Sequence, residues 1–138
     1  MAGSSVTVTR DYISHNGGVM VVKLACVGDD GNGSVPATQI TVADIGAVGY
    51  QLNYTQMGYY LYEVWSIGGA ILPDAADITI TDELGSVLYT EANVIAASTT
   101  PNEGTLAKYK AITSLLTMTV ANQGTVDALW DVYLKFVR

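Results

Sequence analysis

The stretch that decides the fold class is DITITDELGSVLY, residues Asp77–Tyr89. Its first five residues alternate two isoleucines, Ile78 and Ile80, with polar side chains. Successive side chains on a strand point to opposite faces, so the isoleucines are expected in a core and the threonines on an outer face. The acidic, glycine-containing segment Asp82–Gly85 is typical of a solvated turn. The stretch therefore predicts a β-hairpin.

The same period of two runs along most of the chain. In the final segment, Ala128, Trp130, Val132, Leu134 and Phe136 alternate with more polar residues and are expected to point inward. Other runs predicted to share a face are Val6 and Val8; Met20, Val22, Leu24 and Cys26; Val87 and Tyr89; and Leu116, Met118 and Val120.

Seven or eight short strands separated by turn signals predict an all-β fold, a single-domain antiparallel β-sandwich that is jelly-roll-like and spans residues 1–138. At most one short helix is expected, near Thr90–Ala97, because Pro101 and Gly104 would end it. Residues 1–18 carry little periodicity from Arg10 onward. They are consistent either with an N-terminal arm that reaches a neighbour or with an edge strand of the domain.

Composition bears on the partners of the chain. Of its 138 residues, 49% are hydrophobic and 14% charged, where soluble domains average about 25% charge. This excess of apolar residues favours a homo-oligomer, in which part of the surface is buried between subunits, over a monomer with a generous core. The net charge of −7 repels phosphate, which argues against nucleic acid as a direct partner.

The chain gives no sign of a membrane span or of secretion. Its longest apolar run, Val19–Val27, has nine residues and includes Lys23, whereas a spanning helix needs about 20. The first residues lack the basic start and apolar block of a secretory signal, so synthesis in a cytoplasm is expected. The single cysteine, Cys26, excludes an internal disulfide and is interpreted as a small buried hydrophobe.

Titratable groups suited to catalysis are scarce. His15 is the only histidine and lies in a loop-like segment. Because the chain also has a single cysteine, Cys26–His15 is the only thiol–imidazole pair that the sequence could form. The acidic loop Gly28–Pro36 lacks the glycine and the bidentate glutamate of an EF-hand and is interpreted as a plain hairpin loop, with another kind of cation site as the alternative. We therefore assign no catalytic, cofactor-binding or metal-binding residue and expect no enzyme; a small hydrolase is the least favoured alternative.

Aromatic residues gather between positions 50 and 65. The alternation places Leu61 and Trp65 on one face of a strand and Tyr60 and Val64 on the other, so both faces are apolar. We expect this region to combine core with a subunit interface, and a carbohydrate-binding platform is the alternative. The residues assigned to the partner interface are Tyr54, Tyr59, Tyr60 and Trp65.

Three segments together carry a resemblance: GGVMVVKLACVGDDGNGSVPATQI (17–40), YYLYEVWSIGGAILPDAADITITDELGSVL (59–88) and LTMTVANQGTVDALWDVYLKFV (116–137). In their order of strands, acidic glycine-rich turns and Gly/Pro linker they resemble small tailed-bacteriophage virion structural proteins of the capsid decoration (cement) type. The PDAAD before Ile78 departs from the pattern, which would have Asn or Tyr before the aspartate. Residues 47–58 have no counterpart in it.

The resemblance implies a β-sandwich without catalytic residues that binds the outside of a capsid. Its partners would be the major capsid protein and further copies of itself, often as a trimer. The protein would be made in the host cytoplasm and end in the virion. The alternative within the same setting is a tail or head-fibre module that binds a host glycan or receptor through its tyrosines.

Overall fold

The computed structural model describes residues 4–13, 18–40, 60–74, 76–91, 102–104, 110–112 and 115–137. Within these ranges the chain forms strands and loops and no helix, so no described segment is a candidate for a membrane-spanning helix. The expected helix near Thr90–Ala97 is wrong at its start, because Thr90 and Glu91 belong to a strand. Residues 92–97 lie outside the described part of the chain.

Ten strands are described. They are β1 (Ser5–Ile13), β2 (Val19–Val27), β3 (Thr38–Ile40), β4 (Tyr60–Gly68), β5 (Asp77–Thr81), β6 (Val87–Glu91), β7 (Asn102–Gly104), β8 (Lys110–Ala111), β9 (Leu116–Ala121) and β10 (Leu129–Val137).

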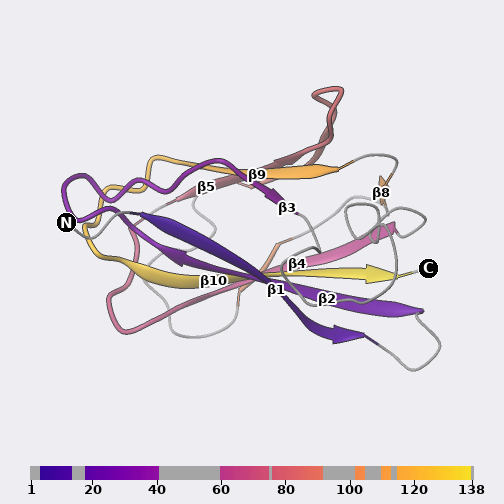
Figure 1. Ribbon diagram of the computed structural model, residues 1–138, viewed down its shortest axis with the longest axis horizontal. Coiled ribbons are helices and arrows are strands. Elements are labelled where there is room, and N and C mark those ends of the chain that lie inside the picture. The colour runs from indigo at the N-terminus through magenta and orange to yellow at the C-terminus, as the bar shows by residue number, and fades with distance from the viewer. Residues whose placement is uncertain are drawn as a thin grey trace.

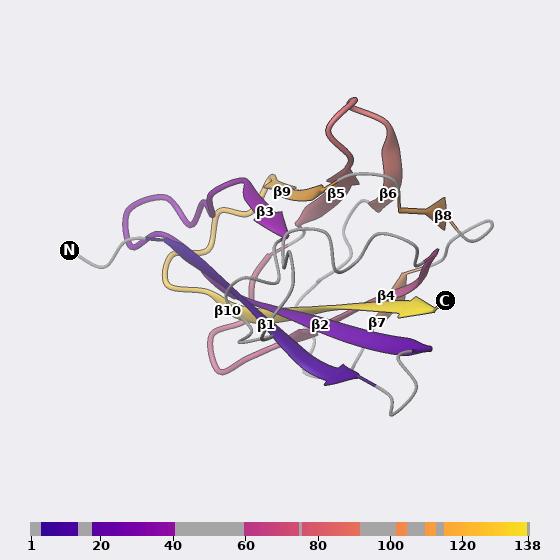
Figure 2. The ribbon, with the colours of Figure 1, turned by 45° about the vertical axis from the view of Figure 1, so that its right-hand side comes forward.

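The strands form two antiparallel sheets that lie face to face (Figures 1 and 2). The larger sheet has the order β1-β2-β10-β4-β7, with β8 also paired to β4. The smaller sheet has the order β3-β9-β5-β6. The chain passes from one sheet to the other after β2, β3, β4, β6, β8 and β9. The order β2-β10-β4-β7 opposite β3-β9-β5-β6 is that of a jelly roll, and it confirms the predicted all-β sandwich.

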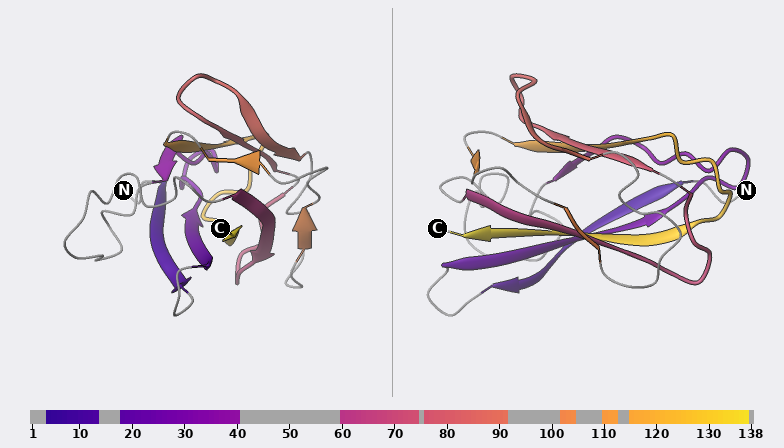
Figure 3. Two further views of the ribbon diagram at one scale, coloured as in Figure 1. Left: turned by 90° about the vertical axis from the view of Figure 1, so that its right-hand side faces the viewer. Right: turned by 180° about the vertical axis from the view of Figure 1, so that it is seen from behind.

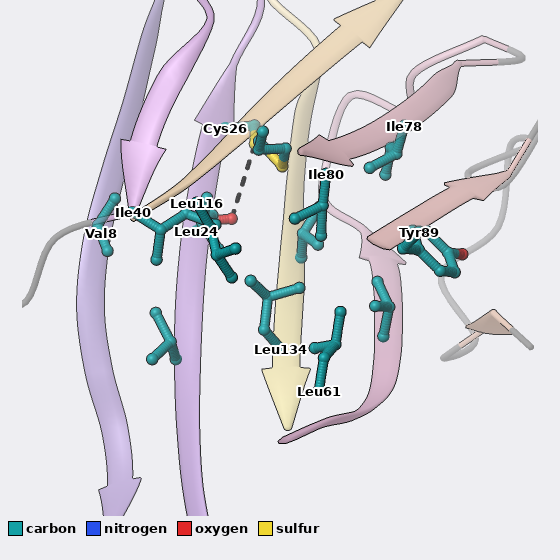
Figure 4. Packing of buried hydrophobic residues seen from close by; sticks show 14 of the residues in the cluster. Val8, Leu24, Cys26, Ile40, Leu61, Ile78, Ile80, Tyr89, Leu116 and Leu134 are labelled. Atoms are coloured by element: carbon teal, nitrogen blue, oxygen red, sulfur yellow. Dashed lines mark hydrogen bonds between the residues drawn. The ribbon is translucent and has the colours of Figure 1, made fainter. Parts of the chain in front are cut away.

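The core lies between the two sheets (Figure 4). Alternate residues of β2 and β10 point into it, and Leu24 and Leu134, at its centre, have no exposed surface. From the opposite sheet, Ile80 and Leu116 are equally buried. The inward faces predicted for Met20–Cys26 and for Ala128–Phe136 are therefore confirmed, because neither strand is interrupted and the period of two holds over its whole length.

The hairpin of β5 and β6 agrees with the sequence at its start and differs after the turn. Ile80 is buried, and Asp82 Oδ1 accepts hydrogen bonds from the backbone N–H groups of Leu84 and Ser86, both at 2.9 Å. A β-bulge then shifts the register, since Ile80 pairs with Tyr89 whereas Thr81 pairs with Val87. Val87 is consequently 51% exposed, and its expected place on the same face as Tyr89 is wrong.

A second bulge changes the faces of β4. Lys135 of β10 pairs with Glu63, whereas its neighbour Phe136 pairs with Leu61. The extra residue, Tyr62, lets Leu61 and Val64 both point into the core although they are three positions apart. The expectation that Leu61 shares a face with Trp65 is therefore wrong.

Strand β1 forms one edge of the larger sheet (Figure 3). It pairs with β2 from Ser5, opposite Val27, to Ile13, opposite Met20. Of the two alternatives for the N-terminal region, residues 5–13 therefore form an edge strand. Val8 is buried in the core, and the exposed threonines Thr7 and Thr9 lie on the outer side.

Candidate functional site on the outer face of the larger sheet

The outer face of the larger sheet is made by the side chains of β2, β10 and β4 that point away from the core. The strand registers arrange them in rows. The central row joins Lys23, Tyr133 and Trp65; the rows on either side join Ala25, Asp131 and Ile67, and Val21, Lys135 and Glu63; the last row joins Val19, Val137 and Tyr60. We call this surface the outer face.

Charges on the outer face are paired. Lys23 Nζ lies 3.9 Å from Asp131 Oδ2, and Lys135 Nζ lies 3.5 Å from Glu63 Oε1. These four residues are the only charged residues of β2, β4 and β10. They add up to zero formal charge, in contrast to the −7 of the whole chain. Each pair is partly exposed, so it contributes little to stability, but it leaves the face electrically neutral.

An aromatic groove lies at the centre of the outer face. It is open, has a volume of about 370 Å³ and is lined by Trp65, Ile67, Tyr133 and Lys135, together with Ser66. Lys135 Nζ lies 4.8 Å from the centroid of the Trp65 ring, a cation–π contact. The Trp65 Nε1 atom is buried and has no hydrogen-bond partner among the described residues. The groove is therefore a mainly apolar depression with one cation at its wall.

Exposed apolar side chains continue the outer face to one end of the sheet. Val19 is 39% exposed and Tyr60 45% exposed, and both pair with Val137 of β10. Tyr12 of β1, which pairs with Val21 of the next row, is 54% exposed. Isolated apolar side chains are common on protein surfaces, but a contiguous group of them usually marks an interaction surface.

The residues that the sequence assigned to a partner interface have different outcomes. Tyr60 and Trp65 both lie on the outer face, one at its end and one in its groove. Tyr54 and Tyr59 lie outside the described residues. Sequence reasoning missed Tyr133 and Lys135, because their alternation with core residues indicated only that they point outward.

The described residues do not assemble a metal site. No group of three or more histidine, cysteine or acidic residues in the described ranges is placed to hold a metal ion. Cys26 is buried, and burial, together with the nearby Asp131 carboxylate, raises the pKa of its thiol far above the ordinary value. His15 lies outside the described residues, so the Cys26–His15 pair stays untested.

The acidic loop Gly28–Pro36 uses its polar groups within the chain. Asp29 Oδ1 accepts hydrogen bonds from the backbone N–H groups of Gly31, at 2.7 Å, and Asn32, at 3.2 Å. Asn32 Oδ1 in turn accepts one from Ser34 N–H at 3.0 Å. These are the side-chain-to-backbone bonds that shape turns, and they support the interpretation of this segment as a structural loop.

The smaller sheet presents a threonine face. Thr79 Oγ1 lies 3.2 Å from Thr90 Oγ1, and Thr119 Oγ1 donates a weak hydrogen bond to Thr79 O at 3.5 Å. The hydroxyls therefore bond among themselves and to the backbone. This face is mainly polar, with Asp77 of β5 beside the threonines, and unlike the outer face it carries no aromatic side chain among its described strand residues.

The comparisons with known proteins do not add a relative. No protein-family model matches the chain, and neither a curated protein nor a solved structure matches it significantly.

Proposed function

We propose that this chain is a non-enzymatic virion structural protein of the capsid decoration type, which binds the major capsid protein on the exterior of the capsid as a homo-oligomer. The observation that carries the proposal is the outer face, a neutral, aromatic sheet surface on an otherwise acidic chain. Surfaces that dock on another protein combine apolar area, few unpaired charges and central aromatic side chains. The outer face has all three, and this supports the proposal.

The outer face and the adjoining strand β1 together have a size that suits a stable protein interface. Strands β2, β4 and β10 of the outer face and the neighbouring β1 each have nine residues, and at a rise of about 3.3 Å per residue and a spacing of about 4.8 Å they span roughly 30 by 20 Å. This projected area of roughly 600 Å² approaches the ~800 Å² per partner of a standard complex. Docking through it would stabilise the assembled particle by mass action, because the protein binds only that state.

Cosedimentation with purified capsids tests the proposal. We expect the protein to sediment with expanded tailed-phage heads of its own phage and to stay in the supernatant without them. Tyr60→Asp and Tyr133→Asp place an unpaired charge on the outer face and should weaken binding at least about tenfold. Thr119→Asp, at an exposed position of the threonine face, is the matched control and should bind as the unchanged protein does.

The controls also separate misfolding from lost binding. All three variants should give the circular dichroism spectrum of the unchanged protein; Tyr60 is 45% exposed, so its replacement removes little buried contact. Absence of binding to expanded and unexpanded heads at low and moderate salt would refute the proposed function. Equal weakening by Thr119→Asp and Tyr60→Asp would refute the assignment of the outer face.

The groove supports a second candidate function, recognition of a host glycan by a tail or head-fibre module. Trp65 and Tyr133 pair directly across β4 and β10, and charged side chains that can hydrogen-bond sugar hydroxyls flank them. A glycan array tests this candidate function. If the function is right, we expect the protein to bind a glycan on the array, Trp65→Ala to abolish that binding and Thr119→Ala to leave it intact. An array without hits, or a hit that survives Trp65→Ala, would argue against it.

A further inference from the structure

The long edge of the larger sheet is formed by β1. Within the described residues β1 pairs only with β2, and its nine residues leave the far edge of the strand without a backbone partner. The other strands at sheet edges are shorter: β3 and β7 have three residues each, β8 has two and β6 has five. β1 is therefore the only long edge strand in the described part of the fold.

The first half of β1 also lacks the devices that normally protect an edge. Native edge strands are blunted by charged residues, proline, bulges or short length, because unpaired backbone groups attract another strand. Ser5–Thr9, with the sequence SVTVT, contains no charge, proline or glycine and has high β propensity. A bulge and two charged residues appear only from Arg10 onward. The segment Ser5–Thr9 is thus a template for strand addition at an edge that no described strand covers.

The residues of this segment are complementary to themselves. In an antiparallel pair of two copies centred on Thr7, each Thr7 lies opposite the other Thr7, Val6 lies opposite Val8, and Ser5 lies opposite Thr9. Valines then meet on the core side, where Val8 is 4% exposed and Val6 packs against the core. Threonines meet on the outer side, a cross-strand pair that stabilises sheets.

Charge favours the same place of contact. Two copies of a chain with net charge −7 repel each other, so contact is least unfavourable where neither copy carries charge. We infer that β1 of one molecule pairs antiparallel with β1 of a second copy, centred on Thr7, to give a two-fold symmetric dimer whose larger sheets form one continuous sheet. Such a contact is isologous and closes after two copies.

The dimer has a consequence for docking. The two-fold axis of an antiparallel strand pair is perpendicular to the sheet, so the outer faces of both copies lie on the same side. A bivalent surface of this kind raises the apparent affinity for a particle that offers repeated sites. This consequence rests on the proposed function, whereas the strand pairing itself does not.

The dimer is tested on the isolated protein by light scattering coupled to size-exclusion chromatography. We expect a mass of about 29 kDa, twice the 14.6 kDa of one chain. Thr7→Lys places two ammonium groups opposite each other and should raise the dimer dissociation constant at least tenfold. Thr119→Lys, the same change at an exposed position of the other sheet, should leave the mass unchanged. A mixture of Thr7→Lys and Thr7→Glu should dimerise again.

A cysteine at position 7 tests the register. Directly opposed residues of antiparallel strands have Cα atoms about 4.5–5.5 Å apart, within the range that a disulfide spans. Thr7→Cys should therefore form an intermolecular disulfide under mild oxidation, and Thr119→Cys should not; Cys26 is buried and does not compete. A monomeric protein at high concentration, or a dimer that neither Thr7→Lys weakens nor Thr7→Cys links, would overturn the inference. Because no capsid is present, these outcomes are independent of the proposed function.

Discussion

Replacement of Gln123 should destabilise the fold more than any other polar substitution in its loops. Gln123 lies in the loop between β9 and β10, and it is 7% exposed. Its Nε2 donates to Gly33 O at 2.6 Å and to Thr125 O at 3.0 Å. Its Oε1 accepts from Thr125 N–H at 2.9 Å and from Asp74 N–H at 3.2 Å. One side chain thus joins three loops at one end of the sandwich.

The size of the effect follows from these four bonds. Each contributes about 0.5–1.5 kcal/mol net, and a buried group left without a partner costs about 1–3 kcal/mol. The Gly33 carbonyl is in the buried part of the network, whereas water can replace Gln123 at the part-buried positions. We therefore expect Gln123→Ala to lower the free energy of unfolding by about 2–4 kcal/mol. With a typical urea dependence of about 2 kcal/mol per molar, the midpoint would fall by about 1–2 M.

Urea unfolding followed by circular dichroism measures this loss, with Gln39→Ala as the matched control at an exposed position of β3. Gln123→Glu adds a sharper test, because it keeps the acceptor oxygen and replaces the amide NH2 group, which donates two hydrogen bonds, with a second acceptor oxygen. At neutral pH it should cost at least as much as Gln123→Ala. Its deficit should shrink as the pH falls, because burial and two facing carbonyl oxygens raise the pKa of a carboxyl group there and protonation restores a donor.

A midpoint shift below about 0.3 M for Gln123→Ala would refute the reasoning about the network. So would a Gln123→Glu variant whose stability equals that of the unchanged protein at every pH, since it would mean that the two donated bonds contribute nothing.

Three further predictions concern the backbone, the core and the thiol. Gly33→Ala should strongly lower the free energy of unfolding, because a φ of 78° is strained for alanine and the added Cβ would lie 2.6 Å from the backbone of Gly124. Gly85→Ala has a similar φ but open space around the added Cβ, so it should lower the free energy of unfolding by only about 1 kcal/mol. Urea unfolding measures both changes. Leu134→Ala should cost about 2–5 kcal/mol, and a loss below 1 kcal/mol would contradict its central place in the core. Cys26 should resist thiol reagents until the protein unfolds; because burial raises its pKa, the free energy of unfolding should fall as pH rises above 9.0, the ordinary value of the thiol, and Cys26→Ala should lack that slope.

The sequence predicted the fold where strands are regular. The alternation in β2 and β10 identifies the core face correctly because each strand pairs along its whole length without interruption. It failed at Leu61 and Val87, where a bulge inserts one residue and shifts the phase of everything beyond it. A bulge depends on the partner strand as much as on the local residues, so a pattern in one strand does not reveal it.

The candidate site was predictable only in part. Tyr60 and Trp65 were accessible to sequence reasoning because aromatic residues cluster around them. The pairing of Lys135 with Glu63 and the contact of Lys135 with Trp65 depend on the register between β10 and β4, which are distant in the sequence. Likewise, the composition of 121–127 indicates a turn but not that Gln123 bonds to Gly33, 90 positions away.

The most direct test of the central claim is a cryo-electron microscopy map of expanded capsids saturated with this protein. We expect density for the jelly roll on the capsid exterior, with the outer face of β2, β10 and β4 against the major capsid protein and the threonine face toward solvent. Tyr133 and Trp65 would lie inside that contact. A capsid contact made through the threonine face, or particles without bound density at saturating protein, would contradict the account.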